Sequence, residues 1–595
     1  MKRLFIAAIL LTLIACKKEI YVSGIVLDPS NATLTINQTL RLTAIVVPEN
    51  ATNKAIIWKS SNSSVATVVD GLVTAVGTGS TTITAITQDG GFTATCAVTV
   101  AVRVVGVTVT PPILNLGVGN SETLTTTFSP GNATNQSVSW TSSNPSVATV
   151  TNNGVVTAVS IGTAIIEAVT SDGGYKATCT VIVNIFAGNG SQANPYLIGT
   201  AGQLVKFAEL MNAGTLPYAA PGMCYKLSDN IDLSTYSSGA GWKPIAPFLG
   251  NFDGANHTVS NLYINRQGES RIGLFSEIGD NATVKNLGIV NANVKGGIST
   301  GGISGYMDGR MENCFVTGSV SGSEYVGGIA GDLSGGNMSD CYFTGEVFGS
   351  ENNIGGVAGY LYGSSSMTNC RSTALTTVTG NFNVGGVVGY NGGTISSCSN
   401  DGNVSGLNSY AGGVIGVNGG VATACNNTGN IISDNLTGGV VGSNKGSITA
   451  SRNTGSIMGG SIIGGVVGEN SAQGNITACY NTGYVTGRYI QIGGVVGGNW
   501  GSIIACYNTG RVSTDYSYAA GGIAGSNDFS ITACYWGQST AYAGVGYGAA
   551  NTTISFISVF TPSGSPAWGV GTGQTNGWWK TGTTNGAILP KLWWE

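Results

Sequence analysis

The apolar residues in the second half of the chain fall in runs of three to five that are separated by glycines, and they show no helical period. Most runs belong to a phrase of the form Gly-Gly-x-x-Gly, in which x is usually Ile, Val or Ala. The phrase returns every 26 to 30 residues, starting at residues 301, 327, 355, 385, 412, 438, 464, 493 and 521. A fixed period of this length predicts a solenoid of short β-strands, in which each coil rises roughly 4.8 Å and buries its apolar side against its neighbours.

A small residue stands thirteen to fifteen positions after each Gly pair. Ser451 takes the place that Cys holds in the other coils, so the position needs a small side chain and not a disulfide partner. Stacked equivalent positions also have parallel Cβ vectors, which disulfide geometry does not favour. We therefore predict a packing ladder of buried free thiols. Its cysteines are Cys314, Cys341, Cys370, Cys398, Cys425, Cys479, Cys506 and Cys534.

Two positions after this small residue, Asn recurs in five successive coils. Asn tolerates left-handed backbone, and its amide can bond the turns above and below it. The pattern predicts a structural ladder at a corner of the coil rather than a ligand site. Its members are Asn400, Asn427, Asn453, Asn481 and Asn508.

The residue between the small position and the Asn varies in kind, from Arg and Ser to Tyr. Such variety predicts that the position faces water, and that Tyr480, Tyr507 and Tyr535 form an exposed aromatic stripe on consecutive coils. A stripe of this kind is our candidate for binding sugar rings or a partner protein. The alternative is the ordinary exposed tyrosine of a β-surface.

The GGxxG phrase, together with a run such as CYNTG at 479–483, resembles the GLUG-motif repeats of bacterial surface proteins, which also occur in some bacterial immunoglobulin-A metallopeptidases. The resemblance covers about residues 190–540, and the segment 194–264 resembles the lead-in of such β-helices. It implies a right-handed β-helix and names no shared catalytic residues.

Both ends of the solenoid are expected to be capped. Residues 199–214 place Leu204, Phe207, Ala208, Leu210 and Met211 at helical spacing, which predicts a short amphipathic helix over the first coil. The last segment contains half of the tryptophans of the chain, namely Trp568, Trp578, Trp579, Trp593 and Trp594. We expect an aromatic cap there, with a sugar-stacking site as the alternative.

Residues 22–100 and 104–183 are two copies of one module. IIWKSSNSSVATV at 56–68 matches VSWTSSNPSVATV at 138–150, which aligns Trp58 with Trp140. Short strands punctuated by Gly, Asn and Pro predict a β-sandwich. Both copies resemble the bacterial immunoglobulin-like group 2 domain, with the two tryptophans in the core and Cys96 and Cys179 as buried thiols.

The first fifteen residues combine two basic residues with a short apolar run, as in a secretory signal. The sequence LIAC ending at Cys16 resembles the lipobox of bacterial lipoproteins, which implies cleavage before Cys16 and its acylation. The alternative is an ordinary secretory signal with a chance cysteine. We expect the lipid on Cys16 to anchor the exported chain in the outer membrane, facing the cell exterior.

Composition and motifs exclude several classes of function. Charged residues make up only 9% of the chain, so no basic patch for nucleic acid is expected. The one histidine, His257, excludes an HExxH zinc site, and no catalytic, metal or cofactor motif is found. Acidic residues are scattered; Asp332 and Glu469 directly follow GGxxG, but in nonadjacent coils, so we expect no carboxylate row.

The predicted architecture is all-β: two tandem immunoglobulin-like β-sandwiches followed by a right-handed β-helix with a short N-terminal capping helix. The leading function is an adhesin that binds an extracellular glycan or protein; the alternatives are a polysaccharide-active enzyme and a non-binding structural surface component. The oligomeric state stays open. The expected segments are a signal peptide (1–15), a lipidated tether (16–21), two Ig-like domains (22–101 and 102–185), the first coils (186–300), nine GGxxG coils (301–540) and a Trp-rich cap (541–595).

Overall fold

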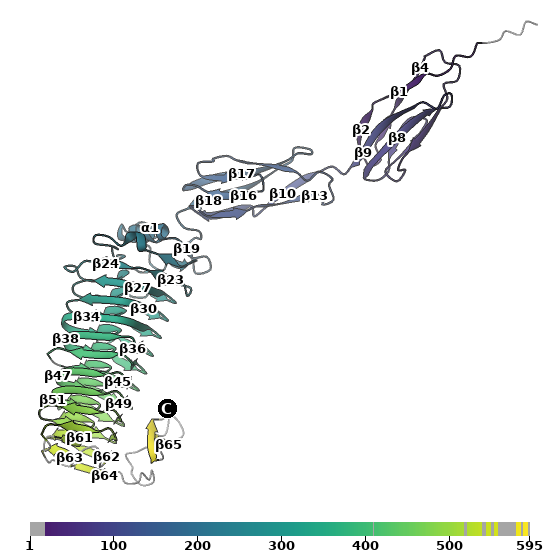
Figure 1. Cartoon of the computed structure of the whole chain (residues 1–595). Coiled ribbons are helices and arrows are strands. Elements are labelled where there is room, and N and C mark those ends of the chain that lie inside the picture. Colours follow the sequence, from purple (N-terminus) through teal and green to yellow (C-terminus); the bar gives the residue numbers. More distant parts are fainter. Residues whose placement is uncertain are drawn as a thin grey trace, which may run out of the picture. The chain divides into compact units, whose positions relative to one another are not determined.

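The computed structural model describes residues 18–408, 410–516, 520–537, 543–548, 552–556, 579–584 and 587–592. The chain divides into two compact units, Met1–Asn184 and Ile185–Glu595 (Figure 1). Cys16, Trp568, Trp578, Trp593 and Trp594 lie outside the described residues. Among the described residues, no helix is long and apolar enough to cross a membrane.

The first unit contains two modules with the same strand order, as the paired sequence copies predict. Each module has a four-stranded sheet in which the second strand pairs in parallel with the last, a three-stranded sheet and a two-stranded pair. In the first module these are β2(Asn31–Thr35)-β9(Thr93–Ala101)-β8(Gly79–Thr87)-β5(Ile56–Ser60), β3(Thr39–Arg41)-β7(Leu72–Ala75)-β6(Ala66–Val69) and β1(Gly24–Asp28)-β4(Thr43–Val47). In the second they are β11(Ile113–Gly117)-β18(Lys176–Asn184)-β17(Gly162–Thr170)-β14(Val138–Ser142), β12(Ser121–Thr123)-β16(Val155–Ala158)-β15(Ala148–Val150) and β10(Gly106–Thr110)-β13(Thr125–Ser129).

The cores of the modules follow the prediction with one adjustment. Cys96 and Cys179 are fully buried free thiols, as predicted. Trp58 and Trp140 are half-buried and pack against the edge of each core. Each indole lies against a glycine, Gly71 or Gly154, whose missing side chain leaves room for the ring.

The second unit is a parallel β-solenoid of about 12 turns, which confirms the predicted all-β coil stack. Its strands run from β19(Tyr196–Ile198) to β64(Thr552–Phe556) as one continuous system, and equivalent strands of successive coils pair in parallel (Figure 1). Equivalent residues therefore stack in columns along the solenoid. The last described strands, β65(Trp579–Thr584) and β66(Ala587–Leu592), form an antiparallel pair.

The predicted capping helix is α1(Ala201–Asn212), which lies across the end of the solenoid where β19 begins (Figure 1). Thr200 caps it by accepting a hydrogen bond from the Gln203 backbone N–H. All five predicted apolar residues of the helix are buried. Phe207 packs against Tyr225 and Phe252, so the first coils begin on a dry aromatic layer.

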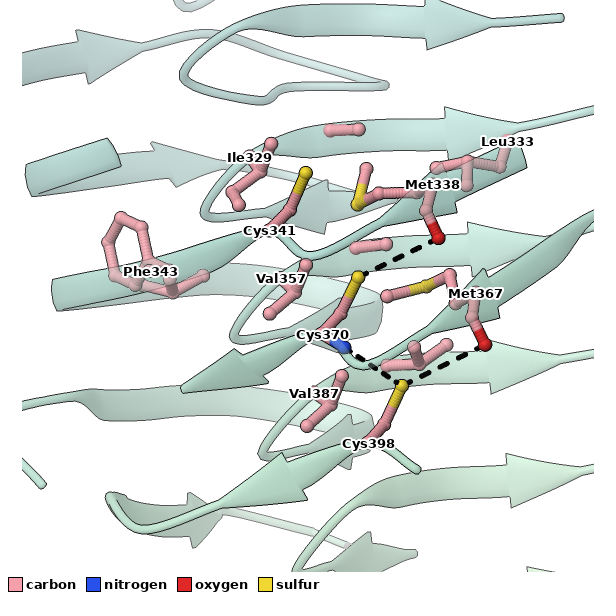
Figure 2. Packing of buried hydrophobic residues seen from close by; sticks show 14 of the residues in the cluster. Ile329, Leu333, Met338, Cys341, Phe343, Val357, Met367, Cys370, Val387 and Cys398 are labelled. Carbon is pink, nitrogen blue, oxygen red and sulfur yellow. Dashed lines mark hydrogen bonds between the residues drawn. The ribbon is translucent and has the colours of Figure 1, made fainter. Parts of the chain in front are cut away.

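The cysteine ladder runs through the interior of the coils, and all eight of its thiols are free, as predicted. Figure 2 shows Cys341, Cys370 and Cys398 above one another, beside the Ile or Val of each GGxxG phrase. The ladder also forms hydrogen bonds that the packing argument omits. The Cys398 Sγ donates to the Ser396 carbonyl at 3.4 Å and accepts from the Cys370 N–H at 3.4 Å. Ser451 can replace Cys because its hydroxyl makes the same two contacts, to the Thr449 carbonyl and from the Cys425 N–H.

The predicted Asn ladder is fully buried, and each amide Nδ2 donates to the Oδ1 of the Asn in the next coil. These distances, from Asn400 through Asn427, Asn453 and Asn481 to Asn508, are 2.9, 2.7, 2.7 and 2.9 Å. A second ladder of the same kind was not predicted. It joins Asn391, Asn418, Asn444, Asn470, Asn499 and Asn527 at 2.7 to 2.8 Å.

The glycines of the phrase make room for this stacking. A Cβ on Gly439, the second of its pair, would lie 2.1 Å from the Gly465 carbonyl oxygen and 2.4 Å from Asn453. Because real Cβ atoms do not approach that closely, the phrase requires Gly there. Close contact between the coils therefore requires the repeated glycines.

Candidate functional site

The predicted tyrosine stripe is correctly placed in one column but is not exposed. Tyr480 is 6% and Tyr507 is 3% exposed, and Tyr535 is half-buried. The Tyr480 and Tyr507 rings stack at 4.8 Å with an interplanar angle of 3°, so each covers one face of the other. Arg452 lies in the same column with its Nη1 3.4 Å from the Tyr480 hydroxyl. The prediction that this position faces water was wrong. A position that accepts residues of different kinds can also be buried when the neighbouring side chains of its column cover it.

A different column carries half-exposed aromatic and acidic groups. It consists of the residue that directly follows each GGxxG phrase, and the parallel register aligns these residues on consecutive coils. Its first four members are Tyr306 on β28(Ser304–Met307), Asp332 on β32(Ala330–Leu333), Tyr360 on β35(Ala358–Leu361) and Tyr390 on β39(Val388–Asn391). We call these four residues, with Arg271, Glu277, Asp308, Glu324 and Tyr325 around them, the aromatic–acidic face.

The tyrosines at one side of Asp332 form an ordered platform. Tyr360 and Tyr390 stack at 4.8 Å with an interplanar angle of 6°, and Tyr325 meets Tyr360 edge-on at 5.3 Å. Burial raises the pKa of the Tyr360 hydroxyl to about 12, and the neighbouring Tyr390 adds to this effect. The Tyr360 hydroxyl is therefore neutral at physiological pH, and all three rings are half-exposed.

A left-handed bend positions Tyr325. Its φ is 53°, an uncommon value for an aromatic residue. Gly359, the third glycine of the next coil, packs directly onto this bend, because a Cβ there would lie 2.4 Å from the Tyr325 carbonyl carbon. The same phrase that places Tyr360 on the face therefore also makes room for Tyr325 beside it.

Asp332 interrupts the column of rings. It lies in register between Tyr306 and Tyr360, so the two ring positions are two coils, or roughly 10 Å, apart. Its Oδ1 is buried and has no hydrogen-bond partner. Burial, together with the charge of Asp308, raises the pKa of the Asp332 carboxyl to about 6, although Arg271 opposes the shift.

The other side of the break contains a cation. The Arg271 guanidinium lies over the Tyr306 ring, 4.5 Å from its centroid, and its Nη1 pairs with the Glu277 Oε2 at 2.5 Å. Arg271 is itself at a left-handed bend, with φ 60°. This tyrosine therefore already holds a cation against its ring.

Two of the acidic groups interact although the carboxylates form no row. Asp308 and Asp332 are on neighbouring coils at non-equivalent positions, and they lie close enough for their charges to interact. Glu469 occupies the same column farther along, between Ser443 and Gly498 and near Lys445. The sequence already shows which residue follows each GGxxG phrase. Only the strand register of the coils shows that these residues form one face.

Other candidate regions have fewer groups that could bind a ligand or take part in a reaction. A cavity of about 780 Å³ near the cap is lined by Lys226, Asp253, Lys285 and Glu312, whose charges alternate in register and neutralise one another. His257 lies at a turn in which its backbone N–H donates to the Gly254 carbonyl at 2.8 Å. Among the described residues, no group of three or more His, Cys, Asp or Glu could hold a metal ion.

Comparison with known families agrees with the modules. Residues 21–98 and 103–181 each match the bacterial Ig-like domain (group 2), and residues 350–379 and 380–405 match the GLUG motif. The chain therefore contains two group 2 bacterial Ig-like domains and a GLUG repeat region.

Several named relatives share part of the chain. Halomucin of Haloquadratum walsbyi is 34% identical over 164 residues, which is 26% of this chain and 2% of halomucin. An uncharacterised protein of Clostridium acetobutylicum is 36% identical over 164 residues, 27% of this chain and 17% of that protein. The Ig-like virion protein of Serratia phage KSP90 is 37% identical over 170 residues, 27% of this chain and 66% of its own length.

Among solved structures, a putative immunoglobulin A1 protease from Bacteroides ovatus aligns with 51% of this chain and 79% of its own at 20% identity, with a TM-score of 0.31. The matches to halomucin and to the Clostridium protein span less than a fifth of either relative.

Proposed function

We propose that this chain, in which two group 2 bacterial Ig-like domains precede a GLUG-repeat solenoid, is an exported surface protein that binds an extracellular glycan through the aromatic–acidic face. The domain content and relatives that include a virion protein support a surface component. In this proposal the Ig-like domains act as spacers. The acyl group on Cys16 would hold the chain at the outer membrane, as the lipobox resemblance implies.

The break in the aromatic column at Asp332 is the observation that carries the proposal. Stacked tyrosines in a solenoid need no ligand, but a buried carboxylate oxygen without a partner does need an explanation. A sugar would bring hydroxyl donors to the half-exposed side chain of Asp332 and flat C–H surfaces to the half-exposed rings of Tyr306 and Tyr360. The register places these two rings on the coils before and after Asp332.

The test is a glycan- and matrix-protein-array screen of residues 17–595 with two double variants. Tyr306→Ala/Tyr360→Ala removes both rings beside Asp332, and we expect it to abolish binding. Tyr480→Ala/Tyr507→Ala removes the buried pair in the other column, and we expect binding to persist wherever circular dichroism shows a folded chain. Loss only in the second variant would return the site to the predicted tyrosine stripe, and no binding by the wild type would favour a structural coat component.

Asp308 and Asp332 also support a second candidate, a polysaccharide-active enzyme. Paired carboxylates of which one has a raised pKa are the groups that glycoside hydrolysis requires. The discriminating measurement is the release of reducing ends from any glycan that the array identifies. Release that is lost in Asp332→Asn would establish the enzyme, and binding without release would establish the adhesin.

A further inference from the structure

The cavity of about 780 Å³ near the cap is lined by two columns of side chains on the first coils. One column consists of small polar residues, Cys224, Asn251 and Thr283, and continues to Arg310. The other column is charged, and its members stand two residues farther along the same strands, so both columns point to the same side of the sheet. The strands are β20(Cys224–Leu227), β22(Asn251–Asp253), β26(Thr283–Lys285) and β29(Arg310–Glu312). A cavity of this volume can hold a small-molecule ligand.

The first carboxylate of the charged column, Asp253, is already engaged by its own surroundings. Its Oδ1 accepts hydrogen bonds from the Ala255 N–H at 2.9 Å and from the Asn286 Nδ2 at 3.0 Å. Its Oδ2 lies 3.7 Å from the Lys285 Nζ in the next coil. This carboxylate therefore has partners other than Lys226, which precedes it in the column.

The remaining charges leave one ammonium over. Glu312 pairs with Arg310 on its own strand at 3.0 Å. Lys226 is exposed and forms no ion pair within the described part of the chain. The lining thus has three cations and two carboxylates, and its excess positive charge belongs to Lys226. An excess of one positive charge at a cavity of a chain with net charge −4 favours an anionic ligand.

We propose that this cavity binds a glycan unit that carries one negative group, a carboxylate or a sulfate ester, and that this group seats at Lys226. The ammonium would donate charge-assisted hydrogen bonds to the anion. The side chains of Asn251 and Thr283 would hydrogen-bond the sugar hydroxyls. A polyanion is disfavoured, because its further charges would meet Asp253 and Glu312. The site shares no residue with the aromatic–acidic face and does not depend on the proposed function.

The experiment compares four disaccharides by isothermal titration calorimetry with residues 17–595 at near-neutral pH. The probes are cellobiouronic acid, its methyl ester, cellobiose and cellobiose 6′-sulfate, which vary the charge of one group on a common sugar. We expect the acid and the sulfate to bind at least about tenfold more tightly than the two neutral probes. This preference should decrease as salt is added, because Lys226 is exposed.

Three variants locate the charge effect. Lys226→Gln removes the ammonium and should abolish the preference for the charged probes. Lys295→Gln changes an exposed lysine at the end of β27(Gly288–Lys295), outside the cavity lining, and should keep the preference. Tyr306→Ala/Tyr360→Ala alters the aromatic–acidic face and should also keep it. Circular dichroism of each variant provides the folding control.

Cys224 provides an independent readout of occupancy. Every other free thiol of the described residues is buried, whereas Cys224 is half-exposed in the cavity lining on the same strand as Lys226. Alkylation of the folded chain by N-ethylmaleimide should therefore report this residue. We expect saturating cellobiouronic acid to slow the alkylation, and cellobiose at the same concentration to leave its rate unchanged.

The outcomes decide the inference without touching the proposed function. Equal binding of the charged and neutral probes, or binding of none of them, would overturn it. A preference that survives in Lys226→Gln, that disappears equally in Lys295→Gln, or that leaves the alkylation of Cys224 unchanged would also overturn it. An arrayed glycan whose binding requires Tyr306 and Tyr360 would still support the aromatic–acidic face in each of these cases.

Discussion

The early coils, residues 301–384, and the late coils, residues 385–537, use one backbone with two different interiors. Six positions after the Gly pair, the early coils bury Met307, Leu333 and Leu361, whereas every late coil buries an Asn. Two positions after the ladder residue, the early coils have Val316, Phe343 and Ser372, and the late coils again have Asn until Trp536. The early corners are mostly dry, and the late corners are held by amide hydrogen bonds.

The glycines are the same in both sets of coils, which shows what the repeat conserves. A Cβ on Gly328 would lie 2.3 Å from the Phe343 ring, and a Cβ on Gly439 would lie 2.4 Å from the Asn453 amide. The second glycine therefore provides room at a corner, and either an apolar or an amide side chain can fill it. The residue on the outer face also changes along the same column. It is Tyr360 in the last early coil and Tyr390 in the first late coil, and then Val417 and Ser443 in the next two coils.

The largest expected loss of stability comes from a substitution in the interior of the late coils. Asn453→Leu removes one rung, so Asn427 and Asn481 each lose the hydrogen bond to it, and the Gly455 N–H and carbonyl lose their bonds to its amide. Four buried hydrogen bonds are lost at about 1 kcal/mol each, so we expect the unfolding free energy to fall by roughly 3–5 kcal/mol. A change in a dry site of the early coils, Met338→Leu, conserves volume and should cost less than about 1.5 kcal/mol. Denaturant midpoints by circular dichroism measure both, and equal losses would contradict the division into two interiors.

An intermediate effect concerns pH and the outer face. The pKa of Asp332 is about 6 in the folded chain, above its ordinary value near 3.8, so the folded state holds the proton longer. The unfolding free energy should therefore fall as pH rises from about 4 to about 6 and remain lower above that, by roughly 1–2 kcal/mol because the side chain is half-exposed.

Asp332→Asn tests this prediction through thermal midpoints measured across the same pH window. The variant should be more stable than the wild type at neutral pH and equal to it near pH 4. Burial also raises the pKa of Glu469, while Lys445 opposes the shift, so Glu469→Gln serves as the late-coil comparison. An Asp332→Asn midpoint that follows the wild type across the window would mean that Asp332 does not hold its proton as described.

The smallest expected effect concerns a feature that both sets of coils share. Ser451→Cys restores the thiol to the one coil that lacks it and keeps the contacts to Thr449 and Cys425. We expect stability to change by less than about 1 kcal/mol, since the hydrogen bonds persist with a slightly larger atom. A thiol titration of the unfolded chain should count one more free cysteine. A disulfide between neighbouring coils would refute the interpretation of this column as packing and hydrogen bonding.

Sequence reasoning found the parts of the fold that leave a periodic trace. The Gly pairs, the cysteine column and the Asn400 ladder all recur at fixed offsets, so the solenoid, its free thiols and one polar corner could be predicted. The Asn391 ladder leaves an equally regular trace six positions after the Gly pair, so this column too could be predicted. The α1 helix was predictable because its apolar residues alone follow a helical period.

The candidate site was harder to find, since it depends on breaking the pattern. Asp332 has significance only through its neighbours in register, Tyr306 and Tyr360, which are 26 and 28 residues away in the sequence. Exposure of Tyr480 and Tyr507 could not be inferred from residue variety, because ring stacking buries them. In both cases the missing information was which residues stack on which.

The Asn ladders also give the solenoid an electrical direction. Every rung of both ladders donates from Nδ2 toward the C-terminal neighbour, and in the first ladder the Asn453 amide is fixed in this sense because its Oδ1 accepts the Gly455 N–H while its Nδ2 donates to the Gly455 carbonyl. The side-chain dipoles therefore add head to tail in two parallel arrays, and neighbouring amides polarise one another. The negative ends of the arrays are at Asn391 and Asn400, in the coil that follows Tyr360. The late coils thus carry a side-chain dipole along the solenoid axis, and its negative pole faces the early coils that contain Asp308 and Asp332.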